Sequence, residues 1–207
     1  MGIPERLVSR RAVLASATAA GVTILLAPGL TAAAAGTEAA GEVSTNGWPM
    51  QTAADSGLIR TRPVAGSGVT VAVRVGAVET VLVHVIRRFH YEIGTLQPGE
   101  VAGFQAPGPA LTGYRNNHAS GTAIDIRPGW YPAGSRTVSG RDLEVIRAVL
   151  AECAGVVAWG GDLPVPDEAH FQIDVASTDP RLPEVAGRIR GWNDTPGLGA
   201  GVVPAGT

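Results

Sequence analysis

Hydrophobic residues recur at helical spacing in three segments of the chain. In the first, Val78, Val81, Leu82, Val85, Ile86 and Phe89 fall on one face, which predicts a helix over residues 78–93. A second helix is predicted over residues 140–154, because Ser139 and Asp142 are spaced like a capping box and Gly155 suits a left-handed C-terminal position. A short third helix is predicted over residues 183–192.

Shorter runs alternate between apolar and polar positions. Such runs predict strands at residues 69–75, 123–126, 156–159 and 170–175. Because strands and helices are intermixed, the chain is expected to form an α+β domain, with a small antiparallel sheet flanked by helices.

Composition limits the possible architectures and partners. The chain has 207 residues, and 45% of them are hydrophobic, enough to bury the core of one ordinary domain. The net charge of −2 and the lack of an arginine cluster outside the N-terminus predict no nucleic-acid partner. Cys153, the single cysteine, lies at helical spacing with apolar residues and is interpreted as a buried core thiol.

The N-terminal segment is typical of an export signal. Arg10 and Arg11 precede an apolar run from Ala12 to Ala27, and small residues from Thr31 to Gly36 offer cleavage sites. Residues 1–35 are therefore interpreted as a twin-arginine-type signal peptide, so the protein is expected to be secreted or associated with the cell wall. A retained membrane anchor is the alternative, but the run is shorter than the roughly 20 residues that a bilayer requires. No stable membrane span is expected after the signal is removed.

The rest of the chain divides into three parts. Residues 36–47 are small and polar and predict a flexible linker. Residues 48–192 are expected to form the folded domain, and residues 193–207, rich in glycine and proline, a flexible tail. The sequence implies no protein partner.

One short segment, from His118 to Asp125, offers two metal ligands. The two residues would lie roughly 23 Å apart in an extended strand, whereas two ligands of one metal place their donor atoms about 3–4 Å apart. The chain must therefore fold back, and Ser120-Gly121 supplies the turn because glycine accepts a positive φ. In the strand that follows, Asp125 faces away from Ile124 and Ile126, into a cleft.

A second segment, from Asp167 to Asp174, completes the set. His170 begins a strand and is expected to be the third ligand, and Asp167 lies on a loop that can bend over the metal. Two imidazoles and one carboxylate with an open fourth position are typical of catalytic zinc, so one zinc per chain is expected. Asp167 is expected to act as the general base.

Each of these residues also has an ordinary structural interpretation. A lone histidine is usually a core or surface residue, and Asp162, Glu168 and Asp174 can be exposed acids without a role. For His118, Asp125 and His170 this alternative is weaker, because three ligands and a base occur together with turn residues between them.

The motifs resemble those of a family of zinc peptidases. The family includes D-alanyl-D-alanine carboxypeptidases, vancomycin-resistance dipeptidases and phage L-alanyl-D-glutamate endolysins, with the pattern Ser-x-His-x-x-Gly-x-Ala-x-Asp followed by Glu or Asp-x-x-His. Here the segments are Asn116-Asn-His118-Ala-Ser-Gly121-Thr-Ala123-Ile-Asp125 and Asp167-Glu-Ala-His170. The resemblance implies zinc held by His118, Asp125 and His170, with Asp167 catalytic.

Two positions depart from the family pattern. Asn116 replaces the serine, and Gly103-Phe104-Gln105 stands where the family has an upstream Gly-Tyr-Arg whose arginine binds substrate. Glutamine gives no charged, bidentate contact with a carboxylate, so Arg115 or Arg127 is a possible substitute. The substrate-binding residues expected from the resemblance are Arg115, Ser120 and Gln105.

The resemblance implies a secreted zinc peptidase acting on peptidoglycan stem peptides. Both a D-Ala-D-Ala carboxypeptidase and an L-Ala-D-Glu endopeptidase fit the motifs. A non-catalytic zinc-binding domain, as in Hedgehog signalling domains of similar fold, is the alternative from another class.

Overall fold

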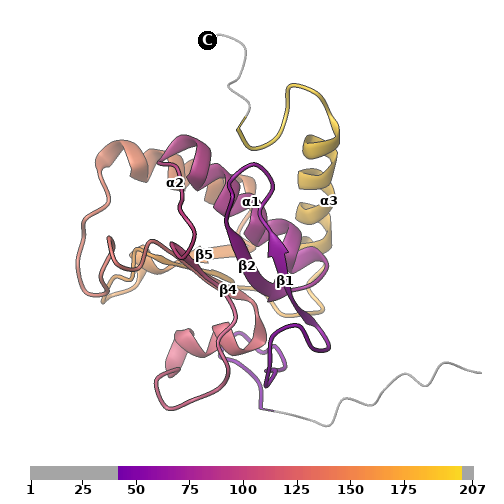
Figure 1. The fold of residues 1–207 in the computed structure, drawn as a ribbon, viewed down its shortest axis with the longest axis vertical. Coiled ribbons are helices and arrows are strands. Elements are labelled where there is room, and N and C mark those ends of the chain that lie inside the picture. Colours follow the sequence, from indigo (N-terminus) through magenta and orange to yellow (C-terminus); the bar gives the residue numbers. More distant parts are fainter. Residues whose placement is uncertain (1–41, 202–207) are drawn as a thin grey trace, which may run out of the picture. The chain divides into compact units, whose positions relative to one another are not determined.

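The computed structural model of the protein describes residues 42–201. The expected signal peptide, residues 36–41 of the expected linker and residues 202–207 of the expected tail lie outside this range. Three α-helices and two short 3₁₀-helices are combined with two antiparallel sheets, which confirms the predicted α+β class (Figure 1). No helix within the described residues is long and apolar enough to cross a bilayer.

The three predicted helices are confirmed within about one turn at each end. They are α1 (Ala77–Glu92), α2 (Gly140–Glu152) and α3 (Arg181–Asp194). The Ser139 hydroxyl caps α2 by accepting a hydrogen bond from the N–H of Asp142, and Gly155 has a left-handed φ of 76°. The 3₁₀-helices are η1 (Gly113–Ser120) and η2 (Gly160–Asp162).

The larger sheet has the strand order β3-β4-β6-β5, and all neighbours are antiparallel. Its strands are β3 (Val101–Ala102), β4 (Ala123–Ile126), β6 (His170–Ile173) and β5 (Val157–Trp159). A separate hairpin pairs β1 (Ile59–Pro63) with β2 (Thr70–Arg74). The sequence pattern did not predict β1, β3 or the 3₁₀-helices.

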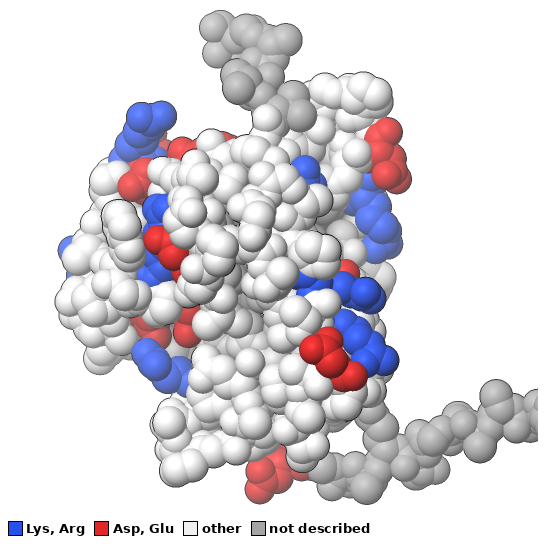
Figure 2. Space-filling model, viewed as in Figure 1, with Lys and Arg blue, Asp and Glu red and all other residues white. Residues whose placement is uncertain are grey.

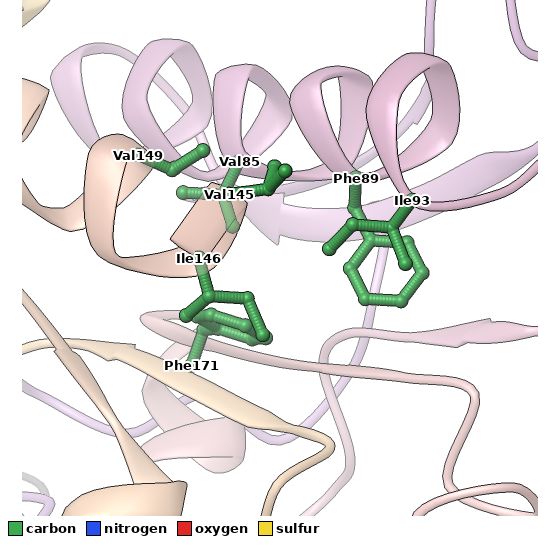
Figure 3. Close-up of a pocket in the computed structure, with 7 residues that line it drawn as sticks. All are labelled: Val85, Phe89, Ile93, Val145, Ile146, Val149 and Phe171. Carbon is green, nitrogen blue, oxygen red and sulfur yellow. The ribbon is translucent and has the colours of Figure 1, made fainter. Parts of the chain in front are cut away.

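One face of the larger sheet belongs to the hydrophobic core. Ile124, Ile126, Phe171 and Ile173 are almost completely buried in one cluster with apolar residues of α1, α2 and α3. A small apolar cavity of about 10 Å³ remains between α1, α2 and Phe171 (Figure 3). Because strand side chains alternate, Asp125 and His170 lie on the opposite face.

The ends of the described chain are hydrogen-bonded to the domain. Residues 42–47 fall in the expected linker, yet the Ser44 hydroxyl is buried and donates to Ser120, and Asn46 donates to the carbonyl of Ile173. At the other end, α3 continues two residues past Trp192, and Arg87 donates to the carbonyl of Ala200.

Candidate metal centre

A glycine turn directs His118 towards the sheet. Helix η1 ends at Ser120, and the next residue, Gly121, has a left-handed φ of 69° and donates its N–H to the carbonyl of His118. A Cβ at position 121 would collide with Ile59 and the backbone of Arg74, so a glycine is required for both conformation and space. The turn predicted at Ser120-Gly121 is therefore confirmed.

Strand register brings the other two residues together. Asp125 of β4 lies directly opposite His170 of β6 in the antiparallel pair. Side chains opposite each other on one face of such a pair have Cβ atoms about 4.5–5.5 Å apart. The two side chains therefore meet without any further rearrangement.

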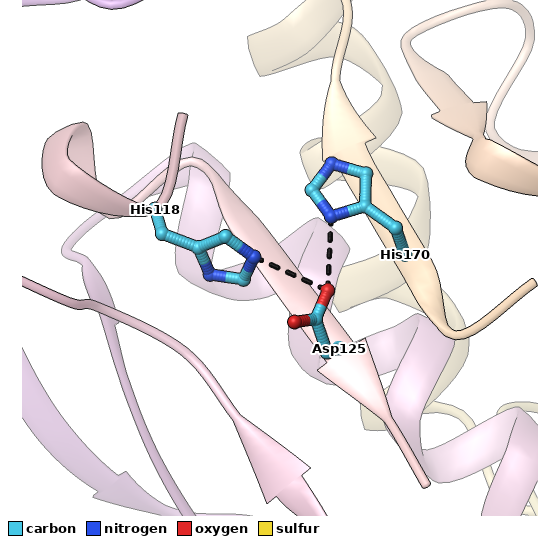
Figure 4. A group of neighbouring side chains, drawn as sticks. All are labelled: His118, Asp125 and His170. Carbon is cyan, nitrogen blue, oxygen red and sulfur yellow. Dashed lines mark hydrogen bonds and ion pairs between the residues drawn. The ribbon is translucent and has the colours of Figure 1, made fainter. Parts of the chain in front are cut away.

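His118, Asp125 and His170 form one compact group (Figure 4). Asp125 Oδ1 lies 3.2 Å from His118 Nε2 and 2.9 Å from His170 Nδ1. The three potential ligand atoms all lie within 4.8 Å of one another. Both histidines are about 1% exposed, and Asp125 is half-buried, so the group opens to solvent on the carboxylate side.

Each histidine has one ring nitrogen that does not contact Asp125, and the hydrogen bond of this nitrogen determines the protonation of the nitrogen that faces Asp125. His118 Nδ1–H donates to the carbonyl oxygen of Gly103 at 2.6 Å, and His170 Nε2–H donates to Gln172 Oε1 at 3.1 Å. When the rings are neutral, their remaining lone pairs therefore point at the Asp125 carboxylate. Two nitrogen lone pairs and a carboxylate oxygen that face one another at these distances can be bridged by protons or by a metal ion, and this set of donor atoms fits an ion such as Zn²⁺.

Asp125 is held as a carboxylate. Burial raises the pKa of the Asp125 carboxyl, but hydrogen bonding and electrostatic interaction with the His118 and His170 side chains outweigh burial and hold this pKa well below its usual range. Asp125 is therefore ionised at neutral pH, as a metal ligand must be.

The carboxylate of Asp167 is fixed by two donors from η1. Tyr114 Oη–H and Arg115 Nη2–H both donate to Asp167 Oδ2, at 2.9 and 2.7 Å. The Tyr114 ring also packs edge-on against His170, with centroids 4.9 Å apart. Burial is the largest of the influences that raise the pKa of the Tyr114 phenol, so Tyr114 remains a donor at neutral pH.

The backbone around Asp167 is equally constrained. Its N–H donates to the carbonyl of Gly160, and its carbonyl accepts from the N–H of His170. A Cβ at position 160 would collide with the Asp167 carbonyl, which explains the glycine there. The Asp167 side chain is 6% exposed, and the Asp167 carboxylate is not one of the three clustered ligand atoms.

The three expected substrate-binding residues lie in different environments. Arg115 reaches Asp167 and keeps 44% of its side chain exposed. Gln105 is exposed, and its backbone N–H donates to the carbonyl of His118. Ser120 is fully buried, with its hydroxyl bonded to Ser44 and the carbonyl of Asn117, so it stabilises the turn and does not face the site.

Arg127, the alternative to Arg115, is bound elsewhere. Its guanidinium donates to Glu100 and the carbonyl of Thr95 and packs over Phe89 and Trp130. The structure therefore brings Arg115, and not Arg127, to the carboxylates of the site.

Two other acids, Asp162 and Glu168, are bound to partners other than the three potential ligands. Asp162 is paired with Arg147 through two hydrogen bonds. Glu168 is 4% exposed, although an exposed acid was a possible interpretation, and its Oε2 accepts from Thr137 N–H, Thr137 Oγ1–H and Val138 N–H. Glu168 thus ties the loop before α2 to the segment that carries Asp167.

The sequence analysis missed Tyr114. A signal for it exists: the Gly-Tyr-Arg tripeptide sought near residue 103 occurs at Gly113-Tyr114-Arg115, directly before the His118 motif. The sequence also did not reveal the hydrogen-bond partners of the two histidines, because such partners leave no spacing pattern. These are the carbonyl of Gly103, Gln172 and, behind Gln172, Asn117.

Comparison with known proteins agrees with this geometry. Residues 111–173 match the family model described as D-alanyl-D-alanine carboxypeptidase. The matched range contains Tyr114, Arg115, the three potential ligands and Asp167. The match supports the resemblance indicated by the motifs: the segment that builds the site is similar to this peptidase family. No curated protein and no solved structure gave a significant match.

Proposed function

We propose that the protein is a zinc peptidase that hydrolyses an amide bond in peptidoglycan stem peptides. The observation that carries this proposal is the convergence of His118 Nε2, His170 Nδ1 and the Asp125 carboxylate beside a separately held Asp167. Three nitrogen and oxygen donors from the protein leave a position for water, as in catalytic zinc sites.

His118, Asp125 and His170 would hold one zinc ion per chain. Bound there, zinc would lower the pKa of a coordinated water and polarise the carbonyl of the scissile bond. The hydrogen bonds of His118 to Gly103 and of His170 to Gln172 orient the rings before binding.

Asp167 is the proposed general base. Its Oδ2 is occupied by Tyr114 and Arg115, and no other hydrogen bond from the described residues reaches Oδ1. Oδ1 can therefore take a proton from the attacking water and return it to the leaving nitrogen. General acid–base catalysis of this kind contributes about 10²–10⁴-fold to a rate.

Arg115 is the proposed site for a substrate carboxylate. One of its five N–H donors is bonded to Asp167, its guanidinium also interacts with Tyr114, and its side chain is partly exposed, so further N–H donors remain for a ligand. Stem peptides carry free carboxylates at their termini and on D-glutamate, and guanidinium binds such groups through two parallel hydrogen bonds. Gln105 would contribute at most an uncharged contact.

Mass spectrometry of digested peptidoglycan tests the proposal. Release of D-alanine indicates a carboxypeptidase, and a cut between L-alanine and D-glutamate indicates an endopeptidase; both should stop on chelation and return with zinc. Intact fragments after incubation with the zinc-loaded protein would instead favour the non-catalytic zinc-binding alternative.

Export through the twin-arginine route is part of the proposal. Replacing Arg10-Arg11 with Lys-Lys should leave precursor inside the cell, because this pair is the recognition element of such signals. Normal secretion of the changed precursor would contradict this route.

A further inference from the structure

The orientation of His170 depends on a chain of amide hydrogen bonds. Its Nε2–H donates to Gln172 Oε1 at 3.1 Å, and the same oxygen accepts from Asn117 Nδ2–H at 2.8 Å. Asn117 Oδ1 in turn accepts from the backbone N–H of Asn46 at 3.1 Å. The chain of bonds thus runs from the segment before the first strand to a residue of the metal centre.

The direction of each bond follows from its neighbour. A backbone N–H can only donate, so Asn117 must turn its oxygen to Asn46 and its NH₂ to Gln172. Gln172 must therefore present its oxygen, and its own NH₂ donates to Asp174 Oδ1 at 2.9 Å. An oxygen facing Nε2 requires that this nitrogen carry the proton, which leaves Nδ1 for the metal.

Burial makes this arrangement costly to reverse. Asn117 is completely buried, so an amide turned the wrong way would lose hydrogen bonds that water could not replace. The segment around Asn46 is fixed independently: the Asn46 side chain donates to Thr122 Oγ1 and the carbonyl of Ile173. The N–H at the start of the chain of bonds is therefore held in place.

We propose that Asn117 and Gln172 are positioning residues for His170. The fixed N–H of Asn46 sets the orientation of their two side-chain amides, and this orientation selects Nδ1 of His170 as its metal-binding atom. The segment at residues 44–46 then helps to orient a ligand of the proposed metal centre. This inference rests on the proposed metal site but not on catalysis. It predicts that replacing the donor of Asn117 by an acceptor weakens metal binding although no metal-binding residue is changed.

Asn117→Asp is the direct test, and Asn116→Asp is its matched control. A carboxylate at position 117 can still accept from Asn46 but cannot donate to Gln172, so Gln172 should turn its NH₂ towards this carboxylate and towards His170. Among the described residues, Asn116 Oδ1 accepts from Thr45 alone, so the change at position 116 adds the same charge and leaves the chain of bonds intact. Zinc affinity, measured by competition with a chelator, should fall about 10–100-fold for Asn117→Asp alone.

A second pair of variants tests the inference even if Asn117→Asp does not fold. Gln172→Leu removes the acceptor and should lower zinc affinity, whereas Gln172→Glu keeps the acceptor oxygen and should restore it. In ¹⁵N NMR spectra of the zinc-loaded wild-type protein, His170 should coordinate through Nδ1 and show a protected Nε2–H. Coordination through Nε2, or equal zinc affinity in Asn117→Asp and Asn116→Asp, would overturn the inference. Failure of the wild-type protein to bind zinc would instead overturn the proposed function.

Discussion

Arg115 donates through Nη2 to the Oδ2 atom of Asp167 at 2.7 Å, and this ion pair links a partly exposed guanidinium to the proposed general base. The same carboxylate oxygen accepts from Tyr114, and no hydrogen bond from the described residues reaches Oδ1. The contact therefore both orients Asp167 and places a guanidinium where a substrate carboxylate can reach it.

Arg115 should determine the preference for substrates with a free carboxylate. Arg115→Gln removes the charge, so KM for a stem peptide with a carboxylate near the scissile bond should rise about tenfold to a hundredfold, the usual contribution of a charged hydrogen bond. The amidated peptide should show little change. Arg115→Lys, which keeps charge but loses the planar fork, should lie between. An equal loss on both peptides would show that Arg115 acts only through Asp167.

Glu168 should stabilise the loop that precedes α2. Its buried carboxylate accepts three hydrogen bonds from Thr137 and Val138, and each charge-assisted bond contributes about 1.5–3 kcal/mol. Glu168→Gln removes the charge, so the midpoint of thermal unfolding should fall, by roughly 2–4 °C for each kcal/mol lost. Glu144→Gln, an exposed change on α2, is the matched control and should leave the midpoint unchanged.

Cys153 should be unreactive in the folded protein. The thiol is completely buried, and burial raises its pKa to about 12, above the ordinary value. At pH 8 the thiolate, which is the reactive form, is therefore nearly absent. A thiol-specific reagent should label Cys153 only after denaturation. Rapid labelling of the native protein would contradict both the burial and the raised pKa.

Much of the fold is predictable because its helices and central strands each bury one face. The apolar spacing of α1 and the alternation in β4 and β6 follow directly from that burial. By contrast, β1 is mostly exposed and β3 has only two residues, so neither leaves a periodic signal. β1 is defined by its pairing with β2 in the hairpin and β3 by its pairing with β4, and a pattern within a single strand does not encode such pairing.

The proposed ligands were accessible from sequence for a different reason. Metal coordination needs particular residue types, and the Gly121 turn between His118 and Asp125 is itself a local signal. Tyr114 and Gln172 act through hydrogen bonds that many residue types can make. The role of residues 42–47 was missed because small polar residues resemble a linker until their partners are known.

The charged side chains on the surface form no broad patch of one sign on the face shown in Figure 2. On the face shown in Figure 2, the described positive and negative side chains are interspersed among uncharged ones. Recognition of substrate is therefore expected to depend on the site itself, above all on Arg115, and not on a broad charged surface.

Zinc content and amide hydrolysis, measured on the same preparations of wild type, His118→Ala and Asp167→Asn, test the central claim most directly. His118→Ala should lose zinc, activity and thermal stability together, because metal binding is linked to folding. Asp167→Asn should keep one zinc per chain and its stability while turnover falls at least about 10²-fold. Stoichiometric zinc in His118→Ala, or loss of zinc in Asp167→Asn, would contradict the division between three ligands and a separate base.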